Sequence, residues 1–192
     1  MNPFDDPTKE ELAVDNVWIF DFDGTLFDSV AKVYAVNRDT RERKALTREE
    51  YYSTYKFDPS VERFDYSEYE DPEVLKKGIA LPMLENMLNI DQNIDKSYMK
   101  GTLYILTARV SKVENAIFEL LQENGIKTLK RENVITTGDL EIKTGKSRHQ
   151  LKKEILETLR KKHTGKVFFI DDEEENIRNA MTIEGISPIK IG

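Results

Sequence analysis

The chain has 192 residues, of which 34% are charged and 39% hydrophobic, and its formal net charge at pH 7 is -7. It contains no cysteine, which excludes disulfides, thiolate nucleophiles and cysteine-ligated zinc or iron-sulfur sites. The acidic excess argues against a protein that holds nucleic acid through many phosphate contacts, because such contacts need concentrated Lys and Arg. The length predicts one domain with a small addition.

The start of the chain, residues 1–15, lacks the basic and apolar stretches of a signal peptide. We expect it to form a flexible leader. No run approaches the roughly 18 apolar residues that a membrane span needs. We therefore expect a cytoplasmic protein without a membrane partner, and the sequence does not indicate an oligomeric state.

An apolar run at residues 17–22 ends in an Asp-Phe-Asp-Gly sequence. This pattern predicts a buried strand that leads into a tight turn. Asp21 and Asp23 are therefore expected at the carboxyl end of a strand.

The rest of the chain alternates short apolar runs with stretches of helical periodicity. This alternation predicts right-handed βαβ crossovers and a parallel sheet covered on both faces, which is an α/β, three-layer, Rossmann-like fold. Ligands on such sheets bind at the carboxyl ends of the strands. The expected strands are 102–107, 133–136, 167–170 and 187–191, and the expected helices are about 111–125, 147–162 and 173–184.

Between residues 38 and 80 the apolar rhythm weakens, and aromatic residues occur among charged ones. We interpret 38–80 as a small, mostly helical cap inserted after the first strand into a core domain of residues 16–37 and 81–192. Its tyrosines and phenylalanines are expected to pack a small satellite core. The alternative is that they stack against a base or another planar leaving group.

Three expected strand ends bring polar side chains to one edge of the sheet: Asp21 and Asp23, then Thr107, then Asp171 and Asp172. Four carboxylates at one edge repel one another, and a hard divalent cation with oxygen ligands relieves that repulsion. The sequence therefore predicts a Mg²⁺ site formed by these four aspartates.

The same residues resemble the signature of the haloacid-dehalogenase-like (HAD-like) phosphohydrolases. The matching segments are Asp21-Phe-Asp-Gly-Thr-Leu26, Leu106-Thr-Ala-Arg109 and Asp171-Asp-Glu-Glu-Glu-Asn176. They occur in the family's order and span most of the chain. The resemblance implies a HAD-like phosphatase, a hydrolase of phosphoric monoesters that forms an aspartyl-phosphate.

In that scheme Asp21 attacks phosphorus, while Asp23 protonates the leaving oxygen and later deprotonates the hydrolytic water. Thr107 donates its hydroxyl to a phosphate oxygen. The neighbouring Gly24, Ala108 and Arg109 are implied to bind substrate, with pairing to a carboxylate as the alternative for the arginine.

In the last motif Asp172 is favoured over Asp171 as the direct metal ligand, and Asn176 would support either. The family's remaining motif is a lone lysine, for which the sequence offers Lys146, Lys152 and Lys153. An advance of about 100° per residue places Lys152 inside the apolar arc of its helix. We therefore expect Lys152 to turn toward the sheet and neutralise phosphate, with a surface role as the alternative.

Two other classes of enzyme, the P-loop kinases or NTPases and the serine hydrolases, have sequence patterns that this chain matches only in part. The Thr144-Gly-Lys-Ser147 segment looks like the end of a P-loop, but Leu140 stands where the full pattern needs glycine. A serine hydrolase needs a Gly-x-Ser-x-Gly elbow and a partnered histidine, whereas His149 and His163 both lie in a polar helical region.

The spacing of Lys152 before Asp171 and Asp172 is similar to that in the phosphatase half of bacteriophage polynucleotide kinase-phosphatases. This similarity implies a phosphorylated substrate that is a nucleotide or a nucleic-acid end. A small-metabolite phosphatase of the same family and a non-catalytic HAD-like binding module are the alternatives.

Overall fold

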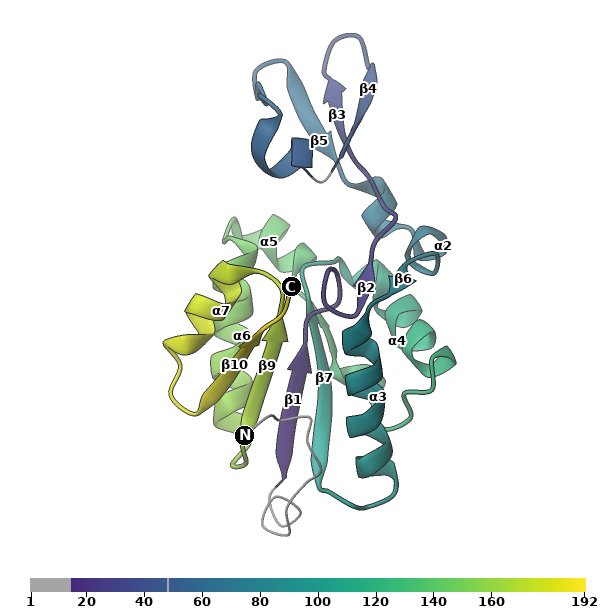
Figure 1. Cartoon of the computed structure of the whole chain (residues 1–192). Coiled ribbons are helices and arrows are strands. Elements are labelled where there is room, and N and C mark those ends of the chain that lie inside the picture. The colour runs from purple at the N-terminus through teal and green to yellow at the C-terminus, as the bar shows by residue number, and fades with distance from the viewer. Residues whose placement is uncertain (1–14, 48) are drawn as a thin grey trace.

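The computed structural model describes residues 15–47 and 49–192, without the side chain of Tyr52 (Figure 1). Apart from Asp15, the expected leader lies outside the described residues. In this described part, no helix is both long enough and apolar enough to cross a membrane.

A parallel sheet of five strands forms the centre of the molecule, in the order β10-β9-β1-β7-β8. All five residues of β1 are buried, as a parallel strand covered on both faces requires. The predicted α/β class and parallel sheet are confirmed, and each predicted strand is present within one or two residues of its expected bounds. The strands are β1 (Asn16–Phe20), β7 (Gly101–Thr107), β8 (Val134–Thr136), β9 (Val167–Asp171) and β10 (Ile186–Lys190).

Helices cover both faces of this sheet (Figure 1). Successive side chains of a strand point to opposite faces, so Trp18 and Phe20 pack in one apolar cluster and Val17 and Ile19 in the other. The first cluster includes residues of α3 (Pro82–Asp95) and α4 (Glu114–Glu123), and the second includes residues of α6 (Arg148–Lys162) and α7 (Glu174–Met181). The short α5 (Gly138–Thr144) leads into α6.

A second structural unit extends beyond the carboxyl edge of the central strands (Figure 1). The antiparallel pair β2 (Phe27–Asp28) and β6 (Ile79–Ala80) forms its stem, and the residues between them, 29–78, are called the insertion here. Three antiparallel strands form its sheet, in the order β4-β3-β5. They are β3 (Val33–Asn37), β4 (Arg43–Leu46) and β5 (Glu62–Asp65).

The expectation of a mostly helical cap is wrong. In the described part of the insertion the helical segments have only four or five residues: a π-helical turn (Glu50–Thr54), a 3-10 helix (Ser67–Glu70) and α2 (Pro72–Leu75). The expected boundary at residue 38 falls between β3 and β4, which pair with each other. Pairing between segments distant in sequence, as between Ala35 and Phe64, creates this sheet, and local periodicity does not reveal such pairing.

Candidate active site

The predicted polar residues meet at the carboxyl edge of the central sheet. Asp21 and Asp23 follow β1, Thr107 ends β7 and Asp171 ends β9. Because β1 pairs with both β7 and β9, the three strand ends are adjacent. A cavity of about 1230 Å³ opens there between the core and the insertion. Its lining includes Asp21, Asp23, Gly24, Thr107, Ala108, Arg109, Lys152 and Asp172.

Lys152 lies at the centre of the buried part of the site. It is 3% exposed, and its Nζ donates to Asp21 Oδ1 at 2.7 Å and to Asp171 Oδ2 at 2.9 Å. The expectation that this lysine turns toward the sheet is confirmed. Lys146 instead pairs with Glu154, whose two carboxylate oxygens each lie 2.8 Å from its Nζ.

The charges in this buried group are strongly coupled. Burial raises the pKa of Asp21 well above its usual value, against the opposing effect of Lys152 and with a further increase from Asp171. For Lys152, burial alone would lower the pKa, but the carboxylates of Asp21 and Asp171 outweigh it and raise the pKa. The lysine therefore stays charged. Because burial disfavours the ionised form of Asp21, a further cation at the site would stabilise that form.

Asp171 is held by three donors. Its Oδ1 accepts the backbone N–H of Glu173 at 2.8 Å, and its Oδ2 accepts both Lys152 Nζ and Asn176 Nδ2 at 2.9 Å. Both Asp171 and Asn176 are buried. Asn176 thus supports Asp171, the first of the two alternatives in the sequence.

Three aspartates fit the requirements of a divalent cation. Asp21, Asp171 and Asp172 each offer a carboxylate oxygen, and these oxygens lie within 4.8 Å of one another. Carboxylate oxygens are the hard donors that Mg²⁺ prefers. Asp23, expected as a fourth ligand, does not belong to this group.

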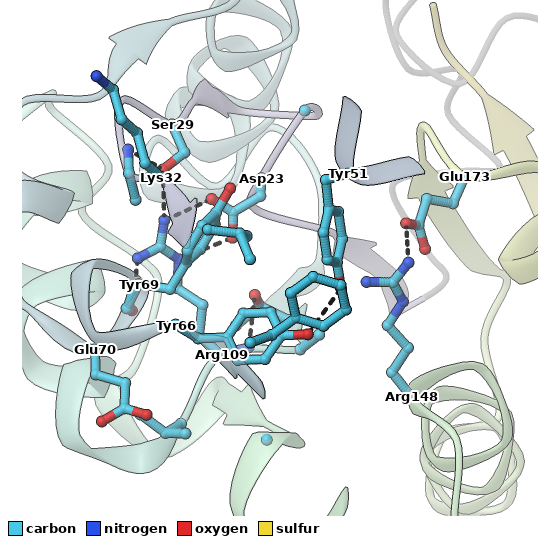
Figure 2. A pocket seen from close by; sticks show the side chains of 18 of the residues that line it. Asp23, Ser29, Lys32, Tyr51, Tyr66, Tyr69, Glu70, Arg109, Arg148 and Glu173 are labelled. Carbon is cyan, nitrogen blue, oxygen red and sulfur yellow. Dashed lines mark hydrogen bonds and ion pairs between the residues drawn. The ribbon is translucent and has the colours of Figure 1, made fainter. Parts of the chain in front are cut away.

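The carboxylate of Asp23 is bound instead by Arg109 (Figure 2). Nε and Nη2 of the buried guanidinium donate to the two oxygens at 2.8 and 2.6 Å. Nη2 also donates to Ser29 Oγ at 3.0 Å, and Nη1 donates to the backbone oxygen of Tyr69 at 2.9 Å. Arg109 therefore joins the turn after β1 to two points of the insertion.

The turn after β1 requires glycine at position 24 for two reasons. The φ angle of Gly24 is +79°, in the left-handed region that side chains disfavour. A Cβ atom placed there would lie 2.3 Å from Oδ2 of Asp172. The absent side chain thus lets the Asp172 carboxylate sit directly against this turn.

Thr107 has a hydroxyl that is available to donate. Its Oγ1 accepts the backbone N–H of Arg109 at 3.3 Å, and no hydrogen bond from this hydroxyl to an acceptor is present in the part of the chain that the structure describes. The residue is buried at the cavity wall. Its proton can therefore serve an oxygen of a ligand in the cavity.

The insertion supplies an aromatic wall to the cavity. Phe57 and Phe64 stack with centroids 4.1 Å apart, Tyr51 packs edge-on to Phe64 at 5.2 Å, and the hydroxyls of Tyr51 and Tyr66 lie 2.9 Å apart. These aromatic residues therefore contact one another, as the predicted satellite core requires, but Tyr66 is still 41% exposed. Tyr51, Phe64, Tyr66 and Tyr69 also line the cavity, as Figure 2 shows for the three tyrosines.

The structure also brings His149 to the site, which the sequence had left in a polar helical region. Its Nδ1 lies 2.8 Å from Asn176 Oδ1, and the residue lines the cavity. The signal in the sequence was the spacing of three residues between His149 and Lys152, since residues three apart share a face of a helix.

Comparisons of this chain with protein families, with curated proteins and with solved structures find no match.

Proposed function

We propose that this protein is a Mg²⁺-dependent phosphomonoesterase of the HAD-like type, with Asp21 as the nucleophile. The observation that carries the proposal is the buried contact of Lys152 with Asp21 and Asp171, beside Asp172 and at the cavity. Burying two carboxylates around one ammonium costs free energy through desolvation, and such strongly perturbed groups occur most often at functional sites. A site that binds a phosphate dianion and a divalent cation is one such functional site.

In the proposed reaction an oxygen of Asp21 forms a bond to phosphorus as the bond from phosphorus to the leaving oxygen breaks. Asp23 gives a proton to that leaving oxygen. A water molecule then attacks the aspartyl-phosphate, gives its proton to Asp23, and releases phosphate with Asp21 restored. Within the described residues only Oδ1 of Asp21 accepts a side-chain hydrogen bond, which leaves Oδ2 for the attack.

The side chains of Asp21 and Asp172 are the proposed direct ligands of Mg²⁺. Asp171 is close enough to contribute, but its two oxygens already accept three hydrogen bonds. A bound Mg²⁺ supplies positive charge against the phosphate oxygens during the transfer. Thr107 and Lys152 supply a hydroxyl donor and an ammonium at the same place.

Arg109 has two successive partners in this proposal. In the structure it occupies both oxygens of Asp23, so proton transfer by Asp23 requires that the guanidinium release one of them. A phosphate group in the cavity offers Arg109 another anion that it can bind through two parallel hydrogen bonds. Substrate binding would then free Asp23 to take up a proton from solvent, which it gives to the leaving oxygen and regains from the hydrolytic water.

A nucleotide or a polynucleotide end is the proposed substrate class, with the insertion acting as a cap. The cavity of about 1230 Å³ exceeds the roughly 300–1,000 Å³ of common small-ligand pockets, and its aromatic wall suits a planar leaving group. The similarity of the lysine-to-aspartate spacing to phage polynucleotide phosphatases supports the same class.

The test compares the wild type with Asp21→Asn and with the control Asp95→Asn, which alters a carboxylate at the far end of α3. Hydrolysis of p-nitrophenyl phosphate is measured with Mg²⁺ and with EDTA, followed by nucleoside monophosphates, 3′-phosphorylated oligonucleotides and glycerol phosphate. We expect activity that needs Mg²⁺, survives in Asp95→Asn and falls by at least about 10³-fold in Asp21→Asn, as for loss of a nucleophile.

Full activity in Asp21→Asn would show that another group is the nucleophile. An inactive wild type across the panel would favour the non-catalytic binding module. A preference for glycerol phosphate over the nucleotides would assign the enzyme to small metabolites.

A further inference from the structure

The side-chain amide of Asn176 has only one orientation that satisfies its neighbours. Its Nδ2 lies 2.9 Å from Asp171 Oδ2 and 3.1 Å from Glu173 Oε2, while its Oδ1 lies 2.8 Å from His149 Nδ1. Ionised carboxylate oxygens only accept hydrogen bonds, so they require the amide NH₂ group. The amide oxygen must then face the imidazole.

This orientation requires a proton on Nδ1 of His149. An amide oxygen only accepts, so Nδ1 of the imidazole must donate. Rotation of the amide by half a turn would place its oxygen against the two carboxylates and its NH₂ group against Nδ1–H. The Nδ1 proton of His149 therefore locks the amide in its productive orientation.

Glu173, the second carboxylate that the Asn176 amide contacts, is itself held in position by an ion pair. Arg148 Nη2 contacts Glu173 Oε1 at 2.9 Å, as Figure 2 shows, while the other carboxylate oxygen receives the Asn176 amide. His149 and Arg148 begin α6, and Glu173 and Asn176 lie at the start of α7. The start of each helix thus contributes to the orientation of the amide.

We propose that His149 is a positioning residue of the active site, a role that rests on the proposed phosphatase function. Four hydrogen bonds connect it to the nucleophile: His149 to Asn176, Asn176 to Asp171, and Lys152 to both Asp171 and Asp21. Without the Nδ1 donor the amide can rotate, Asp171 loses a donor, and the ammonium shifts toward Asp171. The Asp21 carboxylate then loses its alignment for attack.

Two substitutions separate this role from simple packing between α6 and α7. The amide nitrogen of asparagine overlays Nδ1 of an imidazole, whereas that of glutamine overlays Nε2. We expect His149→Gln to lower kcat by about 10-fold with little change in KM, as for loss of an outer support of a metal site. His149→Asn should restore most of kcat, and both variants should have the same melting temperature.

His163→Asn is the matched control, because this histidine follows the other end of α6 and contacts Tyr104. It should leave kcat unchanged. Equal losses of kcat in His149→Gln and His149→Asn would overturn the proposal. So would a loss confined to the melting temperature, because that is the result of packing alone.

The imidazole NMR signals of the wild type give a readout that does not depend on activity. The chain has two histidines, so the His149 signals are assigned by comparison with His163→Asn. The other ring nitrogen, Nε2, lies 3.5 Å from Glu175 Oε2, so we expect a proton on Nδ1 in the wild type, either in the Nδ1–H tautomer or in an imidazolium, and its loss in Asn176→Ala. A neutral Nε2–H tautomer in the wild type would overturn the inference even if the enzyme is active. A proton on Nδ1 that is lost in Asn176→Ala would support it even if every phosphatase assay fails.

Discussion

Lys152 is the residue on which the balance of charge in the site depends. Its ammonium contacts two buried carboxylates, at 2.7 and 2.9 Å. In Lys152→Met the stem volume is kept, but Asp21 and Asp171 face each other without that cation. We expect a loss of about 3–5 kcal/mol in the free energy of unfolding, as for breaking a buried ion pair, together with loss of phosphatase activity. Urea denaturation and phosphate release measure the two effects.

Lys153 provides the control for this substitution. It is the next residue on α6 and makes no ion pair in the described portion of the chain. Lys153→Met should change the free energy of unfolding by no more than about 0.5 kcal/mol and leave the activity intact. Similar losses of stability and activity in both variants would mean that any loss of positive charge from this part of α6 has the same effect. The role proposed for the buried contacts of Lys152 would then be wrong.

Asp21 is expected to reduce the stability of the metal-free protein at neutral pH. Burial raises the pKa of Asp21 in the folded protein above its value in the unfolded chain, which is about 4 for a free aspartate. The contribution of protonated Asp21 to the free energy of unfolding is therefore fully present below about pH 4. It is lost as the pH rises through the pKa of the folded state. Asp21→Asn lacks this ionisation, and its Lys152 still pairs with Asp171. The variant should therefore melt above the wild type at pH 7.

The expected difference is at least about 2–4 °C, which corresponds to about 1 kcal/mol for a chain of this size. It should shrink toward pH 4, and added Mg²⁺ should raise the melting temperature of the wild type more than that of Asp21→Asn. Melting curves in EDTA and in Mg²⁺ across this pH range measure both effects. A difference that does not change with pH would refute the linkage to Asp21.

At the residue scale, the sequence predicted which residues come together in the site more reliably than which of them pair with each other. Helical geometry alone placed Lys152 toward the sheet, because that prediction needs only the period of one helix. For Arg109 the sequence left substrate binding and pairing with a carboxylate both open, and the pairing with Asp23 is one of these two. Contacts with Tyr69 and Ser29 of the insertion help to hold Arg109 in that pairing, and these depend on tertiary structure.

At the scale of elements, the core and the insertion differ in how far local pattern determines structure. Strands β1 and β9 are continuous apolar runs because both of their faces are covered, and they are recognised without their partners. Strand β4 has the sequence Arg-Lys-Ala-Leu with three exposed residues, which is equally compatible with a helix. Its strand form comes from pairing with β3, so the prediction of a mostly helical cap failed there.

The turn after β1 offers a test that separates backbone strain from the position of Asp172. Gly24 and Gly145 have similar φ angles, +79° and +69°. A Cβ at Gly24 would clash with the Asp172 carboxylate, whereas one at Gly145 meets nothing within 4 Å. Alanine at either position should cost about 1–2 kcal/mol in stability from the left-handed backbone.

Only Gly24→Ala should also displace Asp172 and raise the Mg²⁺ concentration needed for half-maximal activity, by about 10-fold. Metal titrations of the phosphatase rate in the two alanine variants measure this difference. An equal response of Gly24→Ala and Gly145→Ala to Mg²⁺ would show that Asp172 does not bind the metal.

At the scale of the whole molecule, several contacts join the core domain to the insertion. They include the β2-β6 stem, Leu75 in the first apolar cluster and the ion pair of Lys76 with Glu119. Another is Arg109, whose guanidinium contacts Asp23 on the core side and Ser29 and the Tyr69 carbonyl on the insertion side. The same side chain lies against the Tyr69 ring, 5.0 Å from its centroid. The position of the insertion and the state of Asp23 are therefore coupled through one residue.

Arg109→Lys tests this coupling while keeping the charge. A lysine has donors at a single point and cannot span two carboxylate oxygens and a carbonyl at once. We expect faster hydrogen exchange in the Ser67–Glu70 and Pro72–Leu75 segments, which flank the lost contact, and unchanged exchange in β1, β7 and β9. The control is Arg178→Lys, because Arg178 forms an exposed ion pair with Glu174 on α7 and should alter neither region. If exchange instead rose throughout the central sheet, Arg109 would be a general stabiliser of the fold, and the proposed release of Asp23 by substrate would lose its structural basis.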